Sequence, residues 1–281
     1  MPPSTPSPQV AAFRRLHEAG CFVLPNPWDR GSARLLHSLG FAALATTSAG
    51  LAFALGRPDS PRALDRDLTL ANVRDIVAAT PLPVTADFQD GYGRTPDEVH
   101  DSVARCAAVG AAGLSIEDAT GDADAPLYPL PMALDRLRAA RAAIDASGTG
   151  ALLTARAECF LTGHPDPLAE SLRRLVAYAE HGADCVYAPG VRAPADIARI
   201  VAAAAPLPVN VLAADPATMT LPLLRDLGVR RVSIGSALAR VGWQAVTAAA
   251  TALRRGDLAP LAAAAPFAEL NGRFGLPSGN G

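Results

Sequence analysis

The chain contains no lysine, because all 25 of its basic residues are arginine. This absence excludes Schiff-base aldolases, pyridoxal enzymes and the phosphate clamp of P-loop proteins, which all need a lysine amine. Cysteine is scarce as well, and its four positions show no CxxC spacing, so neither a zinc site nor a disulfide framework is indicated. We expect a reducing compartment.

No uncharged apolar run approaches the ~20 residues of a membrane span, and no signal segment is recognisable, so we expect a cytoplasmic protein.

Half of the 281 residues are hydrophobic and 19% are charged, which is the composition of a globular chain with a full core. The net charge of −2 gives no general attraction to nucleic acid or to an anionic membrane. We therefore expect a small-molecule ligand, with neither nucleic acid nor membrane as a partner. Residues 1–8 and 271–281 are rich in proline, serine or glycine and are expected to be flexible, which leaves residues 9–270 as one domain.

Short apolar, β-prone runs alternate with stretches of helical spacing, and there are eight of them. Strands that are apolar on both faces and alternate with helices predict a parallel sheet covered on both sides. An open doubly wound sheet is the alternative, but eight units match a single (β/α)8 TIM-type barrel. An extra N-terminal helix is expected at 9–20 and a C-terminal helical extension at 236–255 and 258–270, packed on its own barrel or on a neighbouring subunit. The expected strands are 22–27, 41–48, 83–88, 113–118, 152–158, 185–189, 208–213 and 231–235.

Polar residues stand at the end of nearly every apolar run. Any one of them is accounted for as a turn or cap residue, but functional residues of such barrels lie at the carboxyl ends of the strands. Together these residues therefore predict a site at one end of the barrel. They are Asn26, Thr46, Thr47, Ser48, Asp87, Gln89, Asp90, Glu117, Asp118, Arg156, Glu158, Tyr187, Asn210, Ser233 and Ser236.

Asp87 and Glu117 end adjacent expected strands. Two carboxylates there would repel each other and raise one pKa, whereas a divalent cation makes the pair favourable. The hard oxygen ligands, with no histidine or cysteine among them, favour Mg²⁺, with Mn²⁺ as a substitute. The alternative is that these carboxylates pair with Arg156 and hold no metal.

Arg156 and Glu158 are two residues apart on one strand, so their side chains point to the same face. A planar guanidinium beside a metal suits a carboxylate whose neighbouring oxo group chelates the ion. The backbone amides of Ser48, Ala49, Gly50 and Leu51 are candidate donors to the same carboxylate. The alternative is that this glycine-containing turn only connects two elements.

Several motifs between residues 13 and 240 resemble the isocitrate lyase/phosphoenolpyruvate mutase superfamily. The resemblance implies a (β/α)8 barrel, usually a homotetramer that exchanges a C-terminal helix, with Mg²⁺ and a 2-oxo acid or an enolpyruvate-like substrate. It implies metal ligands at Asp87, Glu117 and Gln89, directly or through water, and a substrate-binding site at Thr47, Ser48, Ala49, Gly50, Arg156 and Asn210. The motifs are Pro27-Trp28-Asp29 with Ser32-Ala33-Arg34, Thr47-Ser48-Ala49-Gly50, Ala86-Asp87 with Gly91-Tyr92-Gly93, Ile116-Glu117-Asp118, Ala155-Arg156-Ala157-Glu158 and Pro208-Val209-Asn210.

The chain departs from the family pattern at two places. Gln89 stands where the family has an acidic residue, which lowers the negative charge around a metal, and Asp90 is the residue that would compensate. The loop at 119–126 lacks the cysteine that serves the isocitrate and methylisocitrate lyases as acid–base group. The phosphonate-forming mutases and related hydrolases use a lysine in this gating loop, and this chain has none. The resemblance therefore points to a phosphonomutase-like branch without the lyase cysteine loop.

The chemistry that these departures leave intact is cleavage of a carbon–carbon bond next to a metal-chelated oxo acid. We expect a Mg²⁺-dependent lyase or decarboxylase for a small 2-oxo or dicarboxylic acid, oxaloacetate-like or methylisocitrate-like. The expected catalytic residues are Arg156, Glu158 and Tyr92, and His164 or a water are further candidates for the proton donor. The alternatives are phosphoenolpyruvate mutase or phosphonopyruvate hydrolase chemistry, and a barrel that binds an oxo acid without turning it over.

Overall fold

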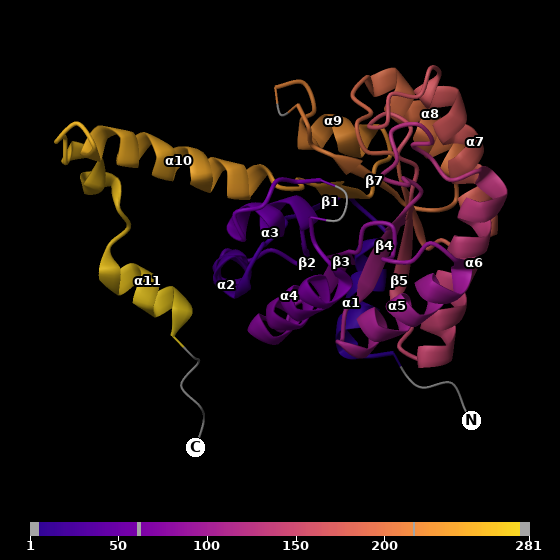
Figure 1. Cartoon of the computed structure of the whole chain (residues 1–281), viewed down its shortest axis with the longest axis horizontal. Coiled ribbons are helices and arrows are strands. Elements are labelled where there is room, and N and C mark those ends of the chain that lie inside the picture. Colours follow the sequence, from indigo (N-terminus) through magenta and orange to yellow (C-terminus); the bar gives the residue numbers. More distant parts are fainter. Residues whose placement is uncertain (1–5, 61–62, 216, 276–281) are drawn as a thin grey trace.

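The computed structural model describes residues 6–60, 63–215 and 217–275, and within them eight parallel strands form one sheet. The strands follow one another around the sheet in the order β1-β8-β7-β6-β5-β4-β3-β2. The ring closes between β2 and the end of β1, where the Ala45 N–H donates to the Pro25 carbonyl at 3.0 Å. The expected (β/α)8 barrel is therefore confirmed (Figure 1). The strands are β1 (Phe22–Leu24), β2 (Leu44–Ala45), β3 (Val84–Asp87), β4 (Gly113–Glu117), β5 (Leu152–Arg156), β6 (Cys185–Tyr187), β7 (Val209–Leu212) and β8 (Arg231–Ser233).

Helices follow the strands and surround the barrel, and side chains at their first turns mark their starts. Asp29 and Ser32 form a capping box at one helix, and Thr95 and Glu98 form another. The helix at Ser48–Ala54 is an addition to the elements expected from the sequence. The helices are α1 (Pro8–Leu16), α2 (Arg30–Ser38), α3 (Ser48–Ala54), α4 (Arg66–Ala79), α5 (Pro96–Ala108), α6 (Leu130–Ser147), α7 (Pro167–Glu180), α8 (Pro194–Ala204), α9 (Leu221–Asp226), α10 (Ala237–Leu253), the 3-10 helix η1 (Ala259–Ala263) and α11 (Phe267–Phe274).

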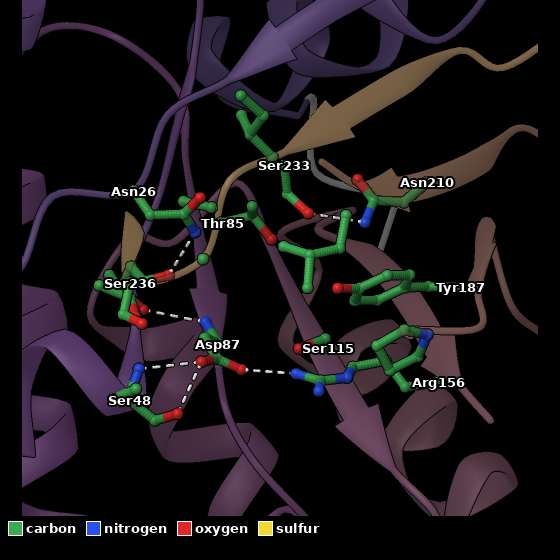
Figure 2. Close-up of a pocket in the computed structure, with 18 of the residues that line it drawn as sticks. Asn26, Ser48, Thr85, Asp87, Ser115, Arg156, Tyr187, Asn210, Ser233 and Ser236 are labelled. Atoms are coloured by element: carbon green, nitrogen blue, oxygen red, sulfur yellow. Dashed lines mark hydrogen bonds and ion pairs between the residues drawn. The ribbon is translucent and has the colours of Figure 1, made fainter. Parts of the chain in front are cut away.

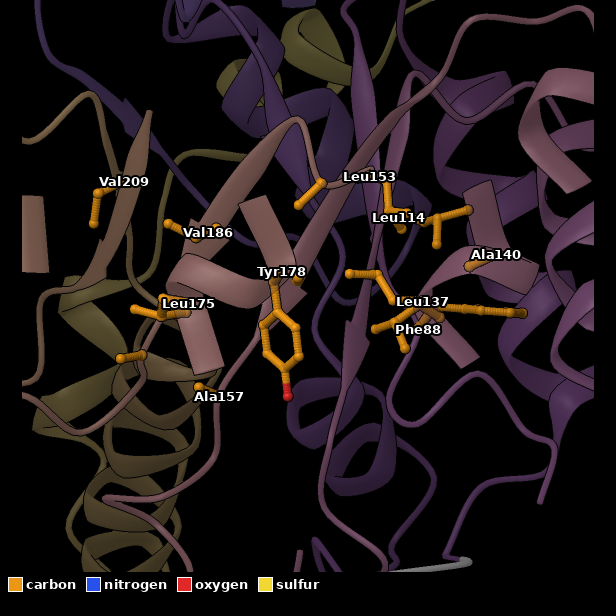
Figure 3. Packing of buried hydrophobic residues seen from close by; sticks show 14 of the residues in the cluster. Phe88, Leu114, Leu137, Ala140, Leu153, Ala157, Leu175, Tyr178, Val186 and Val209 are labelled. Carbon is orange, nitrogen blue, oxygen red and sulfur yellow. The ribbon is translucent and has the colours of Figure 1, made fainter. Parts of the chain in front are cut away.

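The main core lies between the barrel wall and the surrounding helices. Leu114, Leu153 and Val186 project outward from neighbouring strands and meet Leu137 of α6 and Leu175 of α7 (Figure 3). All five are at most 2% exposed. Burying each such side chain contributes roughly 1.5–3 kcal/mol, so the outward faces of the strands hold the barrel together. The inward faces are thereby free to carry polar residues.

Helix α1 closes the amino-terminal end of the barrel. Its Phe13 is fully buried and packs against the start of β4, where a Cβ on Gly113 would lie 3.1 Å from the Phe13 ring and 2.8 Å from the Leu152 carbonyl. Glycine is needed there for this close approach. Ser7 caps α1 by accepting from the Val10 N–H, so the helix begins inside the segment expected to be flexible, and residues 1–5 lie outside the described residues.

The C-terminal extension leaves the barrel. Helix α10 projects away from it, and α11 returns beside α2, where Arg273 donates to Ser38 Oγ at 3.1 Å and Arg34 donates to the Phe274 carbonyl at 3.2 Å (Figure 1). Helix α11 therefore extends into the expected tail, of which residues 276–281 lie outside the described residues. None of the helices in the described part of the chain combines the length and apolarity needed to cross a membrane.

Candidate active site

Three charged side chains from adjacent strands meet at the carboxyl-terminal mouth of the barrel. Asp87 ends β3, Glu117 ends β4 and Arg156 ends β5. Arg156 Nη1 lies 2.9 Å from Asp87 Oδ1, as Figure 2 shows. The same Nη1 lies 2.8 Å from Glu117 Oε1, and Arg156 Nε lies 2.8 Å from Glu158 Oε1. The residues expected to share a small ligand are therefore in direct contact.

Asp87 is held in one orientation by the start of α3. Its Oδ2 accepts from the Ser48 N–H at 2.9 Å and from the Ser48 hydroxyl at 2.8 Å, as Figure 2 shows. Its own N–H donates to Thr46 Oγ1 at 2.9 Å. These bonds fix both the backbone and the carboxylate, so Asp87 is preorganised without a bound ligand.

The site has more carboxyl groups than basic groups. Burial, together with the neighbouring carboxylates, raises the pKa of Glu117 well above its ordinary value, although Arg156 opposes the shift. Burial also raises the pKa of Glu158, again against Arg156. The surrounding carboxylates raise the pKa of Arg156 far above its usual range although burial opposes them, so it stays charged. One guanidinium thus faces Asp87, Glu117 and Glu158.

The donor chemistry fits a divalent cation. Carboxylate oxygens are ligands that Mg²⁺ and Mn²⁺ prefer, and a cation would offset the excess negative charge. In the described ranges no three His, Cys, Asp or Glu side chains converge as a ready-made metal cluster. A cation would therefore have few direct protein ligands and several waters, which is the usual state of Mg²⁺. Pairing of Asp87 and Glu117 with Arg156, the alternative interpretation of the sequence, is present in the structure, and it still leaves the site acidic.

Gln89 and Asp90 follow β3 at the mouth of the barrel. Gln89 has a positive φ of 46°, and its carbonyl accepts from the Glu117 N–H at 2.9 Å. Asp90 was the residue expected to compensate for Gln89. Its carbonyl instead accepts from Arg136, its Oδ1 accepts from the Tyr92 N–H at 3.0 Å, and its Oδ2 lies 3.9 Å from Arg136 Nη2. Arg136 is thus the main cation near Asp90.

The segment expected as a turn of free backbone donors is the first turn of α3. Thr47 is its N-cap and accepts from the Gly50 N–H at 3.1 Å, while the Leu51 N–H donates to the Thr47 carbonyl. The Ser48 N–H is bonded to Asp87. Of the four expected amides only that of Ala49 has no acceptor within the described chain, as is normal for the first residues of a helix. Three of the four expected donors are therefore already bonded within the described chain, and the Ala49 amide is left as a candidate donor.

Tyr187 and Asn210 complete the wall on the side of β6 and β7. The Arg156 guanidinium lies 5.1 Å from the centre of the Tyr187 ring, and burial raises the pKa of this tyrosine to about 12. Asn210 donates to Ser233 Oγ at 3.0 Å and accepts from Arg231 Nε at 2.9 Å. The amide of Asn210 therefore spans two groups on β8, and it lines the cavity beside Arg156.

The candidate proton donors occupy different places. Tyr92 has a positive φ of 54°, and its hydroxyl shares a 2.6 Å hydrogen bond with Thr69. Burial raises its pKa. Glu158 is in contact with Arg156 and faces the mouth. His164 is bonded to the Asp166 backbone in a loop outside the cavity walls. The geometry therefore groups Tyr92 and Glu158 with the site and leaves His164 out of it.

Among the cavities that Arg156 lines, two are large enough for a small molecule. An inner one of about 200 Å³ reaches into the barrel, and an outer one of about 890 Å³ lies over the mouth. Asp59, from the loop after α3, lines both, and burial and the nearby Asp87 raise its pKa. Sequence reasoning missed Asp59. The signal was the stretch Gly56-Arg57-Pro58-Asp59, in which a glycine and a proline indicate a loop after the second strand unit.

Asp118 lies outside this site. Its carboxylate is buried behind the barrel wall, accepts from the Glu158 N–H at 2.8 Å and from the Tyr178 hydroxyl at 2.6 Å, and pairs with Arg174 at 3.0 Å. Because Asp118 follows Glu117 directly, its side chain points to the opposite face of the strand. It secures the backbone of Glu158 and has no direct access to a ligand.

A (β/α)8 barrel with polar and charged residues at the carboxyl ends of its strands has the architecture of barrel enzymes, whose active sites lie at this end. The family model described as phosphoenolpyruvate phosphomutase matches residues 13–254. The chain therefore belongs to this family, within the isocitrate lyase/phosphoenolpyruvate mutase superfamily, as the sequence motifs predicted.

Three similar proteins give the family more detail. A provisionally named lyase/mutase from Burkholderia cenocepacia J2315 is 45% identical, with a TM-score of 0.91 and 96% of each chain covered. An oxaloacetate decarboxylase of Rhodopseudomonas palustris (strain BisB5) is 32% identical over 256 residues, which are 87% of this chain and 84% of that protein. An oxaloacetate acetylhydrolase solved with its product oxalate is 26% identical, with a TM-score of 0.85 and 97% and 96% of the two chains covered.

Proposed function

We propose that the protein is a divalent-metal-dependent carbon–carbon lyase or decarboxylase that acts on a small 2-oxo dicarboxylic acid of the oxaloacetate kind. The observation that carries the proposal is Arg156, which contacts Asp87 and Glu117 and lines both cavities. The similar oxaloacetate decarboxylase and oxaloacetate acetylhydrolase support this substrate class.

Each residue of the mouth has a role in this proposal. Asp87 and Glu117 would hold Mg²⁺ or Mn²⁺, directly or through water, with Gln89 at the same rim. The cation would supply Lewis-acid stabilisation of negative charge that develops on the substrate. Arg156 binds the substrate carboxylate through Nη2, the guanidinium nitrogen that its ion pairs with described carboxylates leave unused. Ser48 keeps the Asp87 carboxylate in place.

The broken carbon–carbon bond leaves an electron pair on the substrate, which must take up a proton at carbon. Glu158 lies 2.8 Å from Arg156, and burial raises its pKa, so it retains a proton more readily than an exposed glutamate. The Tyr92 hydroxyl, bonded to Thr69, is the second donor at the mouth. The outer cavity provides the space through which substrate enters and products leave.

The experiment is turnover of a panel of oxo acids by the purified protein with Mg²⁺, with products identified by NMR. We expect oxaloacetate to be consumed, and Arg156→Ala to lower kcat/KM by roughly 100-fold or more, because the carboxylate receptor is lost. The matched control is Arg138→Ala, which removes an exposed arginine whose one ion pair within the described residues is with its helix neighbour Asp135. Turnover by Arg156→Ala at the wild-type rate would contradict the proposal.

Phosphorus–carbon chemistry is the second candidate, because the family model is that of phosphoenolpyruvate phosphomutase. The absence of lysine disfavours it. Phosphorus NMR of the protein with phosphonopyruvate separates the two reactions. A barrel that only binds oxo acids is the third candidate, supported by Gln89, and it predicts thermal stabilisation by oxo acids without any product.

Oligomerisation and location complete the proposal. Helix α10 exposes Val241 (65%), Trp243 (47%) and Val246 (59%), apolar side chains that a second copy of the chain would cover. We therefore propose a homo-oligomer, and a tetramer by family resemblance. The four cysteines are free thiols, which supports the reducing environment of the cytoplasm.

A further inference from the structure

The interior of the barrel below the mouth is polar. Thr85, Ser115 and Thr154 point inward from β3, β4 and β5, two residues before Asp87, Glu117 and Arg156 on the same strands. Barrels of this kind usually fill this layer with branched apolar side chains. A layer of hydroxyls is suited to a polar occupant.

Arg231 lies in this interior as a cation without a counter-ion. It begins β8 and is only 4% exposed. Its guanidinium donates to Asn210 Oδ1 at 2.9 Å and to Thr154 Oγ1 at 3.1 Å, and it lies 3.3 Å from His17 Nε2. All three partners are neutral, because burial and Arg231 itself lower the pKa of His17 to about 3. Within the described residues no carboxylate forms an ion pair with Arg231.

A buried cation of this kind is costly unless an anion accompanies it. Arginine has five N–H donors, and three of those in Arg231 are directed at the neutral partners. Two donors therefore remain for a ligand.

The inner cavity connects the two arginines. Its volume is about 200 Å³, and its walls include Arg156 at the mouth, Arg231 below, and Ser115, Tyr187 and Ser233 between them. Figure 2 shows Ser233 and Asn210 on one side of this space and Asp87 with Arg156 on the other. Since one water takes about 30 Å³, the cavity has room for a small acid and not only for a water.

We infer that this cavity is a carboxylate subsite in which Arg231 binds the second acid group of a dicarboxylic substrate whose first acid group lies on Arg156. The inference rests on the proposed function, because it assigns the other end of the same substrate. Thr154, which Arg231 contacts, lies about 7 Å deeper along β5 than Arg156, so the two acid groups are held one layer apart. A monocarboxylic acid leaves Arg231 without its anion.

The test compares binding of malate and lactate, which share a 2-hydroxy acid head and differ in the second carboxylate. We expect calorimetry with Mg²⁺ to show malate binding at least tenfold more tightly than lactate. Arg231→Met, which keeps the length of the side chain and removes its charge, should reduce this preference to less than twofold. Arg231→Lys, which keeps the charge, should retain part of it. A wild type without the preference, or Arg231→Met with the preference intact, would overturn the inference.

Bromide gives a readout on the wild type alone, should Arg231→Met fail to fold. An anomalous peak beside Arg231 in a bromide-soaked crystal is expected, and its absence would contradict the subsite. Acetate tests whether the subsite takes a separate acid or only the second carboxylate of the substrate. If acetate binds together with lactate, the subsite also takes free acids. If acetate does not bind, the subsite belongs to the substrate alone. Failure of turnover with the malate preference intact contradicts the proposed function, and turnover without the preference contradicts the subsite.

Discussion

At the scale of single residues, the position of a polar group on its strand decides what it can do. Asp87, Glu117 and Arg156 are the last residues of β3, β4 and β5 and meet at the mouth. Asp118, one residue later than Glu117, points away and becomes structural. A shift of one position along a strand thus separates a candidate ligand-binding group from a packing group.

His17 gives a pH-dependent prediction at this scale. Burial lowers its pKa from 6.5 to about 3, so the unfolded chain binds a proton there more tightly than the folded protein does. Stability is therefore lost as pH falls below 6.5, by about 1.4 kcal/mol per pH unit from this one group. We expect His17→Gln to lose stability less steeply than the wild type between roughly pH 6 and pH 4.

The measurement is urea unfolding across that pH range. His100→Gln, at an exposed position in α5, is the control and should follow the wild type. If the free energy of unfolding fell equally steeply with pH in the wild type and in His17→Gln, the assignment of a neutral, buried imidazole would be contradicted.

The charged residues of the mouth could be predicted from the sequence, because the strands were recognisable and their carboxyl ends are the functional end of a barrel. Asp59 and Arg231 could not. Asp59 approaches Arg156 through a loop whose conformation no local pattern encodes. Arg231 stands at the amino end of its strand, and its contacts with Thr154 and His17 cross the whole barrel.

At the scale of elements, α7 is fastened to the barrel by a buried ionic network. Asp118 accepts from Tyr178 and pairs with Arg174, both on α7, and it also accepts from the Glu158 N–H. Arg174 makes a second pair with Glu170 at 2.6 Å. The network links the helix to the backbone that carries Glu158, so packing and site geometry depend on each other.

We expect Asp118→Ala to destabilise the protein by about 3 kcal/mol, because it removes one of two carboxylate partners of the buried Arg174 and the acceptor of the buried Tyr178 hydroxyl. Asp135→Ala, which breaks an exposed pair with Arg138, should cost at most about 0.5 kcal/mol. Urea midpoints compare the two. Equal midpoints for both variants would show that the Asp118 network adds nothing to stability.

The short helix α3 is the element that sequence reasoning missed. Its seven residues directly follow the polar residues after a strand, and Gly50 within the helix weakens the helical pattern of the sequence. Close packing around the helix leaves no room for a side chain at Gly50. A Cβ there would lie 2.5 Å from Thr47 Cγ2 and 3.1 Å from Trp28 Cβ. The glycine that indicated a turn is therefore a requirement of close packing.

At the scale of the whole molecule, the barrel and its extension differ in how they are covered. The barrel has a continuous core, whereas α10 stands away from it with Val241, Trp243 and Val246 exposed (Figure 1). The expectation from the sequence left open whether the extension packs on its own barrel or on another subunit. Helix α11 contacts α2 of the same chain.

We expect Trp243→Glu to lower the oligomeric state, because a charge in place of this exposed apolar side chain opposes its burial against a second copy. Val176→Glu is the control, since Val176 is a single exposed apolar residue on α7 (40%). Light scattering coupled to size exclusion measures the mass. An unchanged assembly in Trp243→Glu, or a monomeric wild type, would contradict the proposed oligomer.

The three ion pairs of Arg156 affect how a cation and an acid bind to the site. Its guanidinium is shared among Asp87, Glu117 and Glu158, so it is not free to receive an anion at full strength. A cation that takes over part of this negative charge releases the guanidinium for an acid. By thermodynamic reciprocity the acid must then tighten the hold on the cation by the same factor, and the two ligands arrive as a mutually reinforcing pair.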